Sequence, residues 1–302
     1  MDDTAPRNPP SLGREELAER LLTLASKHMH DPLVEIDWDA PVDPERLALP
    51  EHRVCLYGTP LWERMDQRQR ARFASYQWCS TLAAGTWAEL ILIQGLVRGV
   101  YDEGSQSSHA QFALTEVADE CRHSIMFARH MRKLGYTDSG VRALPRHLGR
   151  VLPFLGSTAL FASTLFVEEF VDTMQREMLH DETIEPLARQ VARIHVIEEA
   201  RHISFAREEL ERRCARMSRA ARRLLGRSLA ISAVLYTREL VHPRVYTLTG
   251  LPARSARSAT RTNPAWHRAR VHWSHKAIAV FQELDLIHPD SARIWRRARL
   301  VP

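Results

Sequence analysis

Segments with a helical period of apolar residues dominate this chain. From about residue 62 onward, apolar positions recur every three or four residues, and no stretch shows sustained two-residue alternation with β-branched enrichment. The pattern predicts long helices at 62–100, 107–134, 157–179, 182–217, 219–240 and 265–284. A shorter amphipathic segment predicts an N-terminal helix at 11–28. We therefore predict an all-α fold with few strands.

Other stretches lack this periodicity. Residues 1–10 are acidic and rich in proline, and we predict that they are disordered. Residues 31–60 are also rich in proline and are expected to be extended and irregular. The segment 249–264 follows His242-Pro243 and reads as a loop, because it consists mainly of small and polar residues.

A five-residue motif that occurs twice carries most of the functional information. "DECRH" spans Asp119–His123 and "EEARH" spans Glu198–His202, and each reads acid, Glu, any residue, Arg, His. Glu and His stand three positions apart, so on a helix they project from one face. Glu-x-x-His on two helices, with one Glu from each of two others, is the di-iron or di-manganese pattern of ferritin-like bundles.

The motif thus predicts a ferritin-like four-helix bundle as the core of the protein. We expect one domain over residues 1–302, with the core helices at about 62–217 and accessory N- and C-terminal helices, the latter within 218–302. A chain of this length can bury a large core as a single domain.

Two further helices must each supply an inward-facing Glu. On the segment 62–100, Glu89 lies on an apolar stripe, where an acid is costly unless it is paired or metal-bound. On the segment 157–179, Glu168 has the same setting. Its neighbour Glu169 is the alternative, and we favour Glu168.

A third histidine falls on the same helix face as the second motif. His195 stands four residues before Glu199 and seven before His202, so it can reach the same metal pair. One isolated Glu-x-x-His usually faces solvent, but two matched copies with buried Glu candidates favour a di-metal site. The predicted metal ligands are Glu89, Glu120, His123, Glu168, His195, Glu199 and His202. Carboxylates and imidazoles of this kind suit iron.

The remaining motif residues have a predicted supporting role. A ligating His usually donates its other ring N–H to an acid. We expect Asp119 to accept from His202 and Glu198 to accept from His123, each across the two motifs. Arg122 and Arg201 would then pair with these acids and hold them ionised.

Composition limits the other classes of function. The formal net charge is +5 and the pI is about 9.3, but the basic residues are widely spread, so we interpret them as solvated helix faces and a docked tail, not a nucleic-acid surface. We expect no signal peptide, no transmembrane helix and no membrane partner. The four cysteines, which fit a reduced cytoplasm, are Cys55, Cys79, Cys121 and Cys214. We interpret Cys121 as a core residue and not a ligand.

These motifs resemble those of the AurF-like arylamine N-oxygenases, a di-iron family of the ferritin-like superfamily. The similarity covers most of the chain. It includes "LYGTPLWERM", "ADECRH", "VEEF", "HVIEEARH" and the late segment "NPAWHRARVHWSHKAIAVFQELDLI". The extra His in "HVIEEARH" is the most discriminating feature, because ordinary ferritins and ribonucleotide reductase small subunits usually lack it.

The resemblance implies a function as well as a fold. It implies two iron ions on the seven residues given above, O2 as co-substrate, an external electron donor and a homodimer. Such enzymes oxidise an aryl amine to hydroxylamine, nitroso or nitro products, often in natural-product pathways such as antibiotic biosynthesis. Relatives that take aminobenzoates place an Arg near the substrate carboxylate, and Arg268 and Arg270 are the candidates here. The expected pocket residues are Trp87, Phe127, Phe161, Leu165 and Met174.

Three alternatives remain at this point. C-hydroxylation or desaturation would use nearly the same iron ligands, so only the product separates them from N-oxygenation. Iron storage is disfavoured by the length of the chain, its basic charge and its extra helices. Binding of nucleic acid rests only on the pI and would require retention on heparin that falls steeply with salt.

Overall fold

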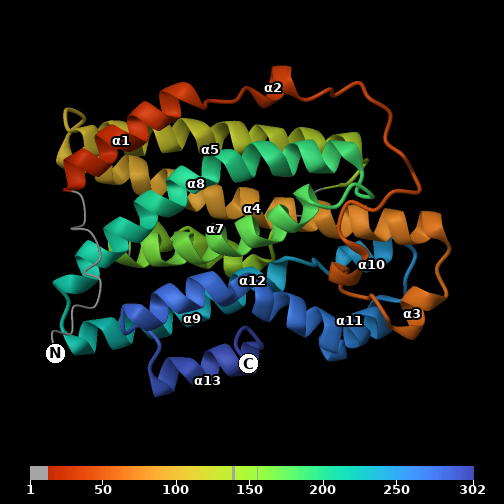
Figure 1. The fold of residues 1–302 in the computed structure, drawn as a ribbon. Coiled ribbons are helices and arrows are strands. Elements are labelled where there is room, and N and C mark those ends of the chain that lie inside the picture. The colour runs from red at the N-terminus through yellow and green to blue at the C-terminus, as the bar shows by residue number, and fades with distance from the viewer. Residues whose placement is uncertain (1–12, 138–139, 155) are drawn as a thin grey trace, which may run out of the picture.

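The computed structural model describes residues 13–137, 140–154 and 156–302, and within these ranges the fold is helical without strands. Four long helices form the central bundle: α4 (Gln67–Glu103), α5 (Ser108–Lys133), α7 (Ser157–Leu179) and α8 (Pro186–Ala215). Helix α4 packs on α5 and α7 packs on α8, and further contacts between α4 and α7 and between α5 and α8 close the bundle (Figure 1). The prediction of an all-α, ferritin-like fold is confirmed.

Accessory helices cover this bundle. Helix α1 (Arg14–Lys27) lies along α5, α12 (Pro264–Glu283) lies on α7, and α9 (Arg219–Glu239) packs between α7 and α13 (Pro289–Ala298). The shorter helices are α2 (Pro32–Glu35), α3 (Pro60–Glu63), α6 (Ala143–Gly149), α10 (Arg244–Leu248) and α11 (Ala253–Thr262), with 3-10 turns η1 (Glu51–Arg53) and η2 (Leu152–Phe154).

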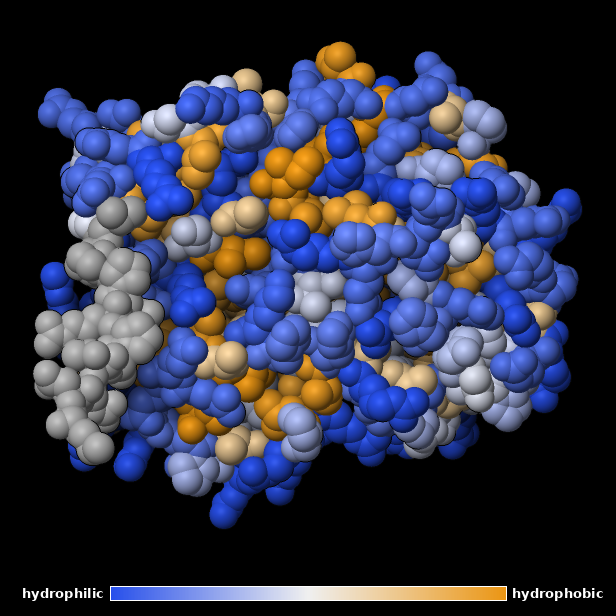
Figure 2. All heavy atoms as spheres, in the orientation of Figure 1, coloured by the Kyte–Doolittle hydropathy of each residue, from blue (hydrophilic) through white to orange (hydrophobic). Residues whose placement is uncertain are grey.

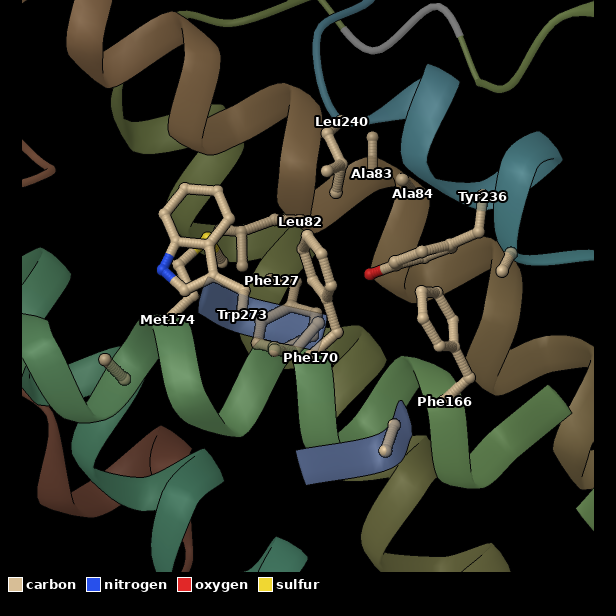
Figure 3. Close-up of a cluster of buried hydrophobic side chains, with 14 of the residues drawn as sticks. Leu82, Ala83, Ala84, Phe127, Phe166, Phe170, Met174, Tyr236, Leu240 and Trp273 are labelled. Carbon is tan, nitrogen blue, oxygen red and sulfur yellow. The ribbon is translucent and has the colours of Figure 1, made fainter. Parts of the chain in front are cut away.

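Helix α7 lies at the centre of the molecule. Its neighbours are α8, α4, α9 and α12, so most of its side chains are buried on every side. Figure 3 shows the result: Phe166 and Phe170 of α7 meet Tyr236 from α9 and Trp273 from α12. This apolar layer holds α7 in place, and with it the acidic residue Glu168 on its inner face.

Several predicted boundaries were wrong. The first core helix begins at Gln67, because Asp66 caps it in a reciprocal pair with Gln69, and residues before it form the separate helix α3. The segment predicted as a loop at 249–264 contains α11, and the C-terminal tail forms α13. Helix α13 was missed because tertiary contacts stabilise it: Trp295 is fully buried against Phe166 and Phe281.

Two further predictions concern single regions. The predicted disorder of residues 1–10 lies outside the described residues. Cys121 is exposed, so its interpretation as a core residue was wrong, whereas Cys55, Cys79 and Cys214 are buried. Position 121 faces outward because Glu120 and His123 occupy the inner face of α5.

Helix α4 has one property of a membrane span. Among the described helices it alone is long and apolar enough to cross a membrane, but half of its most apolar window is buried inside the protein. A core helix of a bundle has the same composition, so this is weak evidence for a span. On the face that Figure 2 shows, the hydrophobic residues lie in separate groups among hydrophilic ones.

A buried carboxylate joins α1, α5 and α8 at one end of the bundle. Glu209 of α8 lies 3.5 Å from Arg14 Nε of α1 and 3.3 Å from His109 Nε2 of α5, and Arg213 donates to it at 3.2 Å. Burial raises the pKa of Glu209, but the hydrogen bond and charge of His109, with Arg14 and Arg213, outweigh it and lower the pKa to about 2. The ionised form therefore stabilises the folded chain.

We predict that Glu209→Gln lowers the free energy of unfolding by about 2 kcal/mol near neutral pH, because it leaves several buried donors without a charged acceptor. The folded-state pKa is depressed, so the contribution is present above about pH 5 and is lost as the pH falls towards 2. Urea unfolding at a series of pH values measures both effects.

The neighbouring Glu208→Gln is the matched control. Glu208 pairs with Arg212 at a partly exposed site, so its loss should change stability by less than about 1 kcal/mol. Equal costs for the two variants, or a Glu209→Gln cost that does not depend on pH, would contradict the assignment.

Candidate metal centre

Seven predicted ligands meet in the interior of the bundle. Each core helix contributes one carboxylate: Glu89 from α4, Glu120 from α5, Glu168 from α7 and Glu199 from α8. The imidazoles come from α5 and α8, through His123, His195 and His202. All seven side chains are buried, with at most 4% of any residue's surface exposed.

Two carboxylates lie between two imidazoles. Nδ1 of His123 is 3.2 Å from Glu120 Oε2 and 3.2 Å from Glu199 Oε1. Nδ1 of His202 is 3.0 Å from Glu120 Oε1 and 3.3 Å from Glu199 Oε2. Glu120 and Glu199 thus each offer one oxygen to either side, which is the arrangement of carboxylates that bridge two ions.

His195 approaches the same cluster from one turn earlier on α8. Its Nε2 lies 3.4 Å from Glu199 Oε1 and 3.7 Å from Glu89 Oε1. Ligand atoms of Glu168, His195 and Glu199 all lie within 4.8 Å of one another, as do those of Glu89, His123 and His195. The structure therefore brings all seven predicted residues together.

The outer nitrogen of each imidazole has an oxygen acceptor. Nε2 of His123 lies 2.8 Å from Glu198 Oε2, and Nε2 of His202 lies 3.2 Å from Asp119 Oδ2. This is the expected pairing across the two motifs. Nδ1 of His195 lies 2.7 Å from Oε1 of Gln175, which can only accept. When a metal ion is bound, an outer N–H that donates to this acceptor would leave the inner nitrogen free to bind the ion.

The two arginines of the motifs neutralise the supporting acids. Arg201 donates to Asp119 Oδ2 at 3.2 Å and lies 3.8 Å from Glu198 Oε1. Arg122 hydrogen-bonds to Asp119 and lies 3.9 Å from Glu198. Burial raises the pKa of Asp119, but the hydrogen bond and charge of His202, followed by the charge of Arg122, outweigh it and lower the pKa.

The inner cluster has the charge and the free atoms that two divalent cations require. Its four carboxylates would balance two such ions, while the two supporting acids are balanced by two arginines. Both oxygens of Glu199 and Nδ1 of His202 have no hydrogen-bond partner among the described residues. Burial and the charges of Glu199 and Glu120 raise the pKa of Glu168 well above its usual value. The donor set therefore fits metal ions.

Two buried residues near the cluster were missed from the sequence. Glu116 is fully buried with both oxygens unpartnered in the described part of the chain, and it forms a potential ligand group with Glu120 and His202. Burial raises its pKa to about 8. The signals were present: Glu116 stands four residues before Glu120, and Gln175 seven after Glu168, so each shares a helix face with a predicted ligand.

Other candidates lie away from the cluster. Glu169 is not part of it, because its surroundings are Lys276, Asp172 and Arg207 on the side of α12. Arg268 is exposed, and Arg270 bonds to the carbonyl of Ala298. Neither arginine is among the residues that line the described cavities at Glu168, so the structure does not support them as ligands of a substrate carboxylate.

Comparison with known proteins identifies the family. The family model described as p-aminobenzoate N-oxygenase AurF matches residues 11–285. The chain belongs to the AurF family. Similar curated proteins are uncharacterized proteins of Mycobacterium tuberculosis and Mycobacterium bovis, each 31% identical over 224 residues, which is 68% of this chain. The match spans 64% of the length of these relatives.

Solved structures with the same fold are R2-like ligand-binding oxidases. One, with aerobically reconstituted metal cofactor after photoconversion, is 13% identical with a TM-score of 0.55, covering 90% of this chain and 93% of its own. Another, a point mutant with anaerobically reconstituted Mn/Fe cofactor, is 15% identical with a TM-score of 0.55, covering 92% of this chain and 94% of its own. At this identity the likeness shows the fold of the AurF-family chain and nothing further.

We predict that Asp119→Asn weakens binding of Fe(II) or Mn(II) by about 10- to 100-fold. The amide keeps the shape but removes the charge that Arg122 and Arg201 face, and it can turn an N–H towards His202. Competition against a calibrated chelator measures the affinity of the purified protein under anaerobic conditions.

Asp172→Asn is the control for this measurement. Asp172 is equally buried on α7 but pairs with Arg176 and Lys276, outside the cluster. Its replacement should leave metal affinity within about twofold of the unaltered protein. If both variants lose affinity alike, or neither does, Asp119 has no special role at the metal centre.

Proposed function

We propose that this AurF-family chain is a di-iron, O2-dependent oxygenase that oxidises the nitrogen of an amine, with aryl amines as the first class to test. The observation that carries the proposal is the convergence of three imidazole nitrogens on four buried carboxylates. The family supports N-oxygenation, since its description names p-aminobenzoate N-oxygenase. The Mn/Fe cofactor named for the structural neighbours makes manganese the alternative occupant of one position.

The proposed reaction needs external electrons. Formation of a hydroxylamine consumes one amine, one O2, two protons and two electrons, and it releases one water. A separate electron donor must therefore supply the two electrons, as the resemblance to the AurF-like enzymes implies. Iron, when bound, would supply the chemistry that reduces O2.

Protein groups position the reacting molecules. Ser124 Oγ donates to Glu89 Oε2 at 2.6 Å, which orients this carboxylate so that Oε1 faces His195. A cavity of about 10 Å³, roughly the smallest that holds one water molecule, is lined in part by Glu89, Glu168 and His195. Glu168 also lines a much larger cavity. We propose that O2 reaches Glu168 through the small cavity and the amine reaches it through the large one.

Product analysis tests the proposal. Protein loaded anaerobically with two Fe(II) per chain, mixed with O2, an aryl amine and a chemical reductant, is expected to yield the hydroxylamine or a more oxidised nitrogen product by mass spectrometry. A product that is hydroxylated at carbon or desaturated would be consistent with the di-iron site but would show that the reaction is not N-oxygenation. Accumulation of ferric oxide without organic product would favour iron storage.

We predict that Glu199→Ala lowers bound iron to well under two per chain and abolishes product, because Glu199 faces all three imidazoles. Iron is measured by elemental analysis after desalting. Glu211→Ala, on the same helix, removes a carboxylate that pairs with Arg207 at the surface, and it should leave iron and product unchanged. Undiminished iron in Glu199→Ala would refute the ligand assignment.

A further inference from the structure

A large cavity connects the metal centre with the surface. Its volume is about 630 Å³, and its walls come from α4, α6, α7 and α9. The inner end is formed by buried residues that include Glu168 and Tyr236, whereas Val151, Leu224 and Ile231 are exposed at the outer end. A molecule that enters there would reach Glu168, which is one of the predicted metal ligands.

The described residues that line this cavity carry little charge. Among the described lining residues there is no Lys, Arg or His, and Glu168 is the one acidic residue. The remaining wall is mainly aliphatic, with a few hydroxyl groups such as Ser163, Ser228 and Ser232. A carboxylate placed in this cavity would lose its hydration without gaining a partner, which is strongly unfavourable.

Two arginines near the inner part of the cavity have other partners. Arg142 precedes α6 and binds Glu239 through its backbone N–H at 3.0 Å and its Nε at 2.6 Å. Arg213 donates to Glu209 at 3.2 Å and to Ser157 Oγ at 2.6 Å. Redirecting Arg142 to a substrate carboxylate would leave the buried Glu239 without its cation, and redirecting Arg213 would weaken the buried cluster around Glu209.

The size of the cavity exceeds that of a single ring. A cavity of roughly 150 Å³ is enough to hold benzene. This one is about four times as large, and its exposed rim is apolar as well. It can therefore accept an aromatic ring together with a chain of several methylenes.

A tyrosine hydroxyl lies near Glu168 at the inner end. Tyr236 extends from α9 towards α4 and α7, between Ala84 and Phe166 (Figure 3). Its hydroxyl has no hydrogen-bond partner among the described residues and lies close enough to Glu168 to feel its charge. This hydroxyl can bind the polar end of a ligand whose body is apolar.

We infer that the substrate is an elongated amine with an uncharged, apolar body, which places its nitrogen at Glu168 and Tyr236 and its chain along the cavity. This excludes an aminobenzoate, whose carboxylate has no partner here, as the preferred substrate. The inference rests on the proposed function for the reaction, but the cavity determines the class of ligand. The binding measurement is therefore kept separate from turnover.

Affinity in the absence of O2 tests the ligand class. Aniline, 4-hexylaniline and 4-aminobenzoate are titrated into iron-loaded protein, with tryptophan fluorescence as the readout because Trp87 lines the cavity. Each buried methylene contributes about fourfold in affinity. We expect 4-hexylaniline to bind at least 100-fold more tightly than aniline, and 4-aminobenzoate no more tightly than aniline.

A cavity-filling variant locates the binding site. Ser228→Phe places a ring in the wall of α9, and it should remove most of the gain from the hexyl chain while aniline binding is retained. Ser258→Phe adds the same ring at an exposed position of α11 and should change neither affinity. Retained aniline binding also shows that the Ser228→Phe protein is folded.

The outcomes separate the two proposals. If 4-hexylaniline binds no better than aniline, if 4-aminobenzoate binds as tightly as 4-hexylaniline, or if Ser228→Phe keeps the full hexyl gain, the inferred substrate class is wrong. If 4-hexylaniline binds as expected but its nitrogen is not oxidised with O2 and reductant, the ligand class stands and the proposed N-oxygenase function fails. If 4-aminobenzoate binds tightly and its nitrogen is oxidised efficiently, the proposed N-oxygenase function stands and the inferred substrate class is wrong.

Discussion

Repulsion among buried carboxylates is the constraint on which this structure depends. Glu89, Glu120, Glu168 and Glu199 face one another inside a helical core, where unpaired negative charge is strongly disfavoured. Three imidazoles face them, and each is held by an acceptor behind it. The arrangement is self-consistent when two divalent cations occupy the centre, because the ligand charges and the ion charges then cancel.

The accessory helices hold the carboxylates in place and form part of the cavity that leads to them. Helices α9 and α12 cover α7 with aromatic side chains, which fixes Glu168 on the inner face of the bundle. The same α9 forms a wall of the apolar cavity that ends at Glu168. Helix α7 thus contributes Glu168 to the metal centre and also forms part of the wall of the apolar cavity.

The repeated motif made the centre predictable from the sequence, because the period of a helix fixes which residues share a face. The cross-pairing of Asp119 with His202 and of Glu198 with His123 followed from the need of a ligating imidazole for an acceptor. Gln175 and Glu116 were missed, since a neutral amide and a solitary Glu resemble ordinary helix residues until the packing is known. Helix α13 and the cavity without a cation depend on contacts between distant segments, which no local pattern reveals.

The most direct test of the central claim is X-ray diffraction from crystals of iron-loaded protein, with anomalous data on both sides of the iron edge. We expect two iron peaks per chain between Glu120 and Glu199. A ring nitrogen of each of His123, His195 and His202 should lie within bonding distance of one of the two ions. A single peak, iron bound elsewhere, or His195 turned away from both ions would contradict the claim.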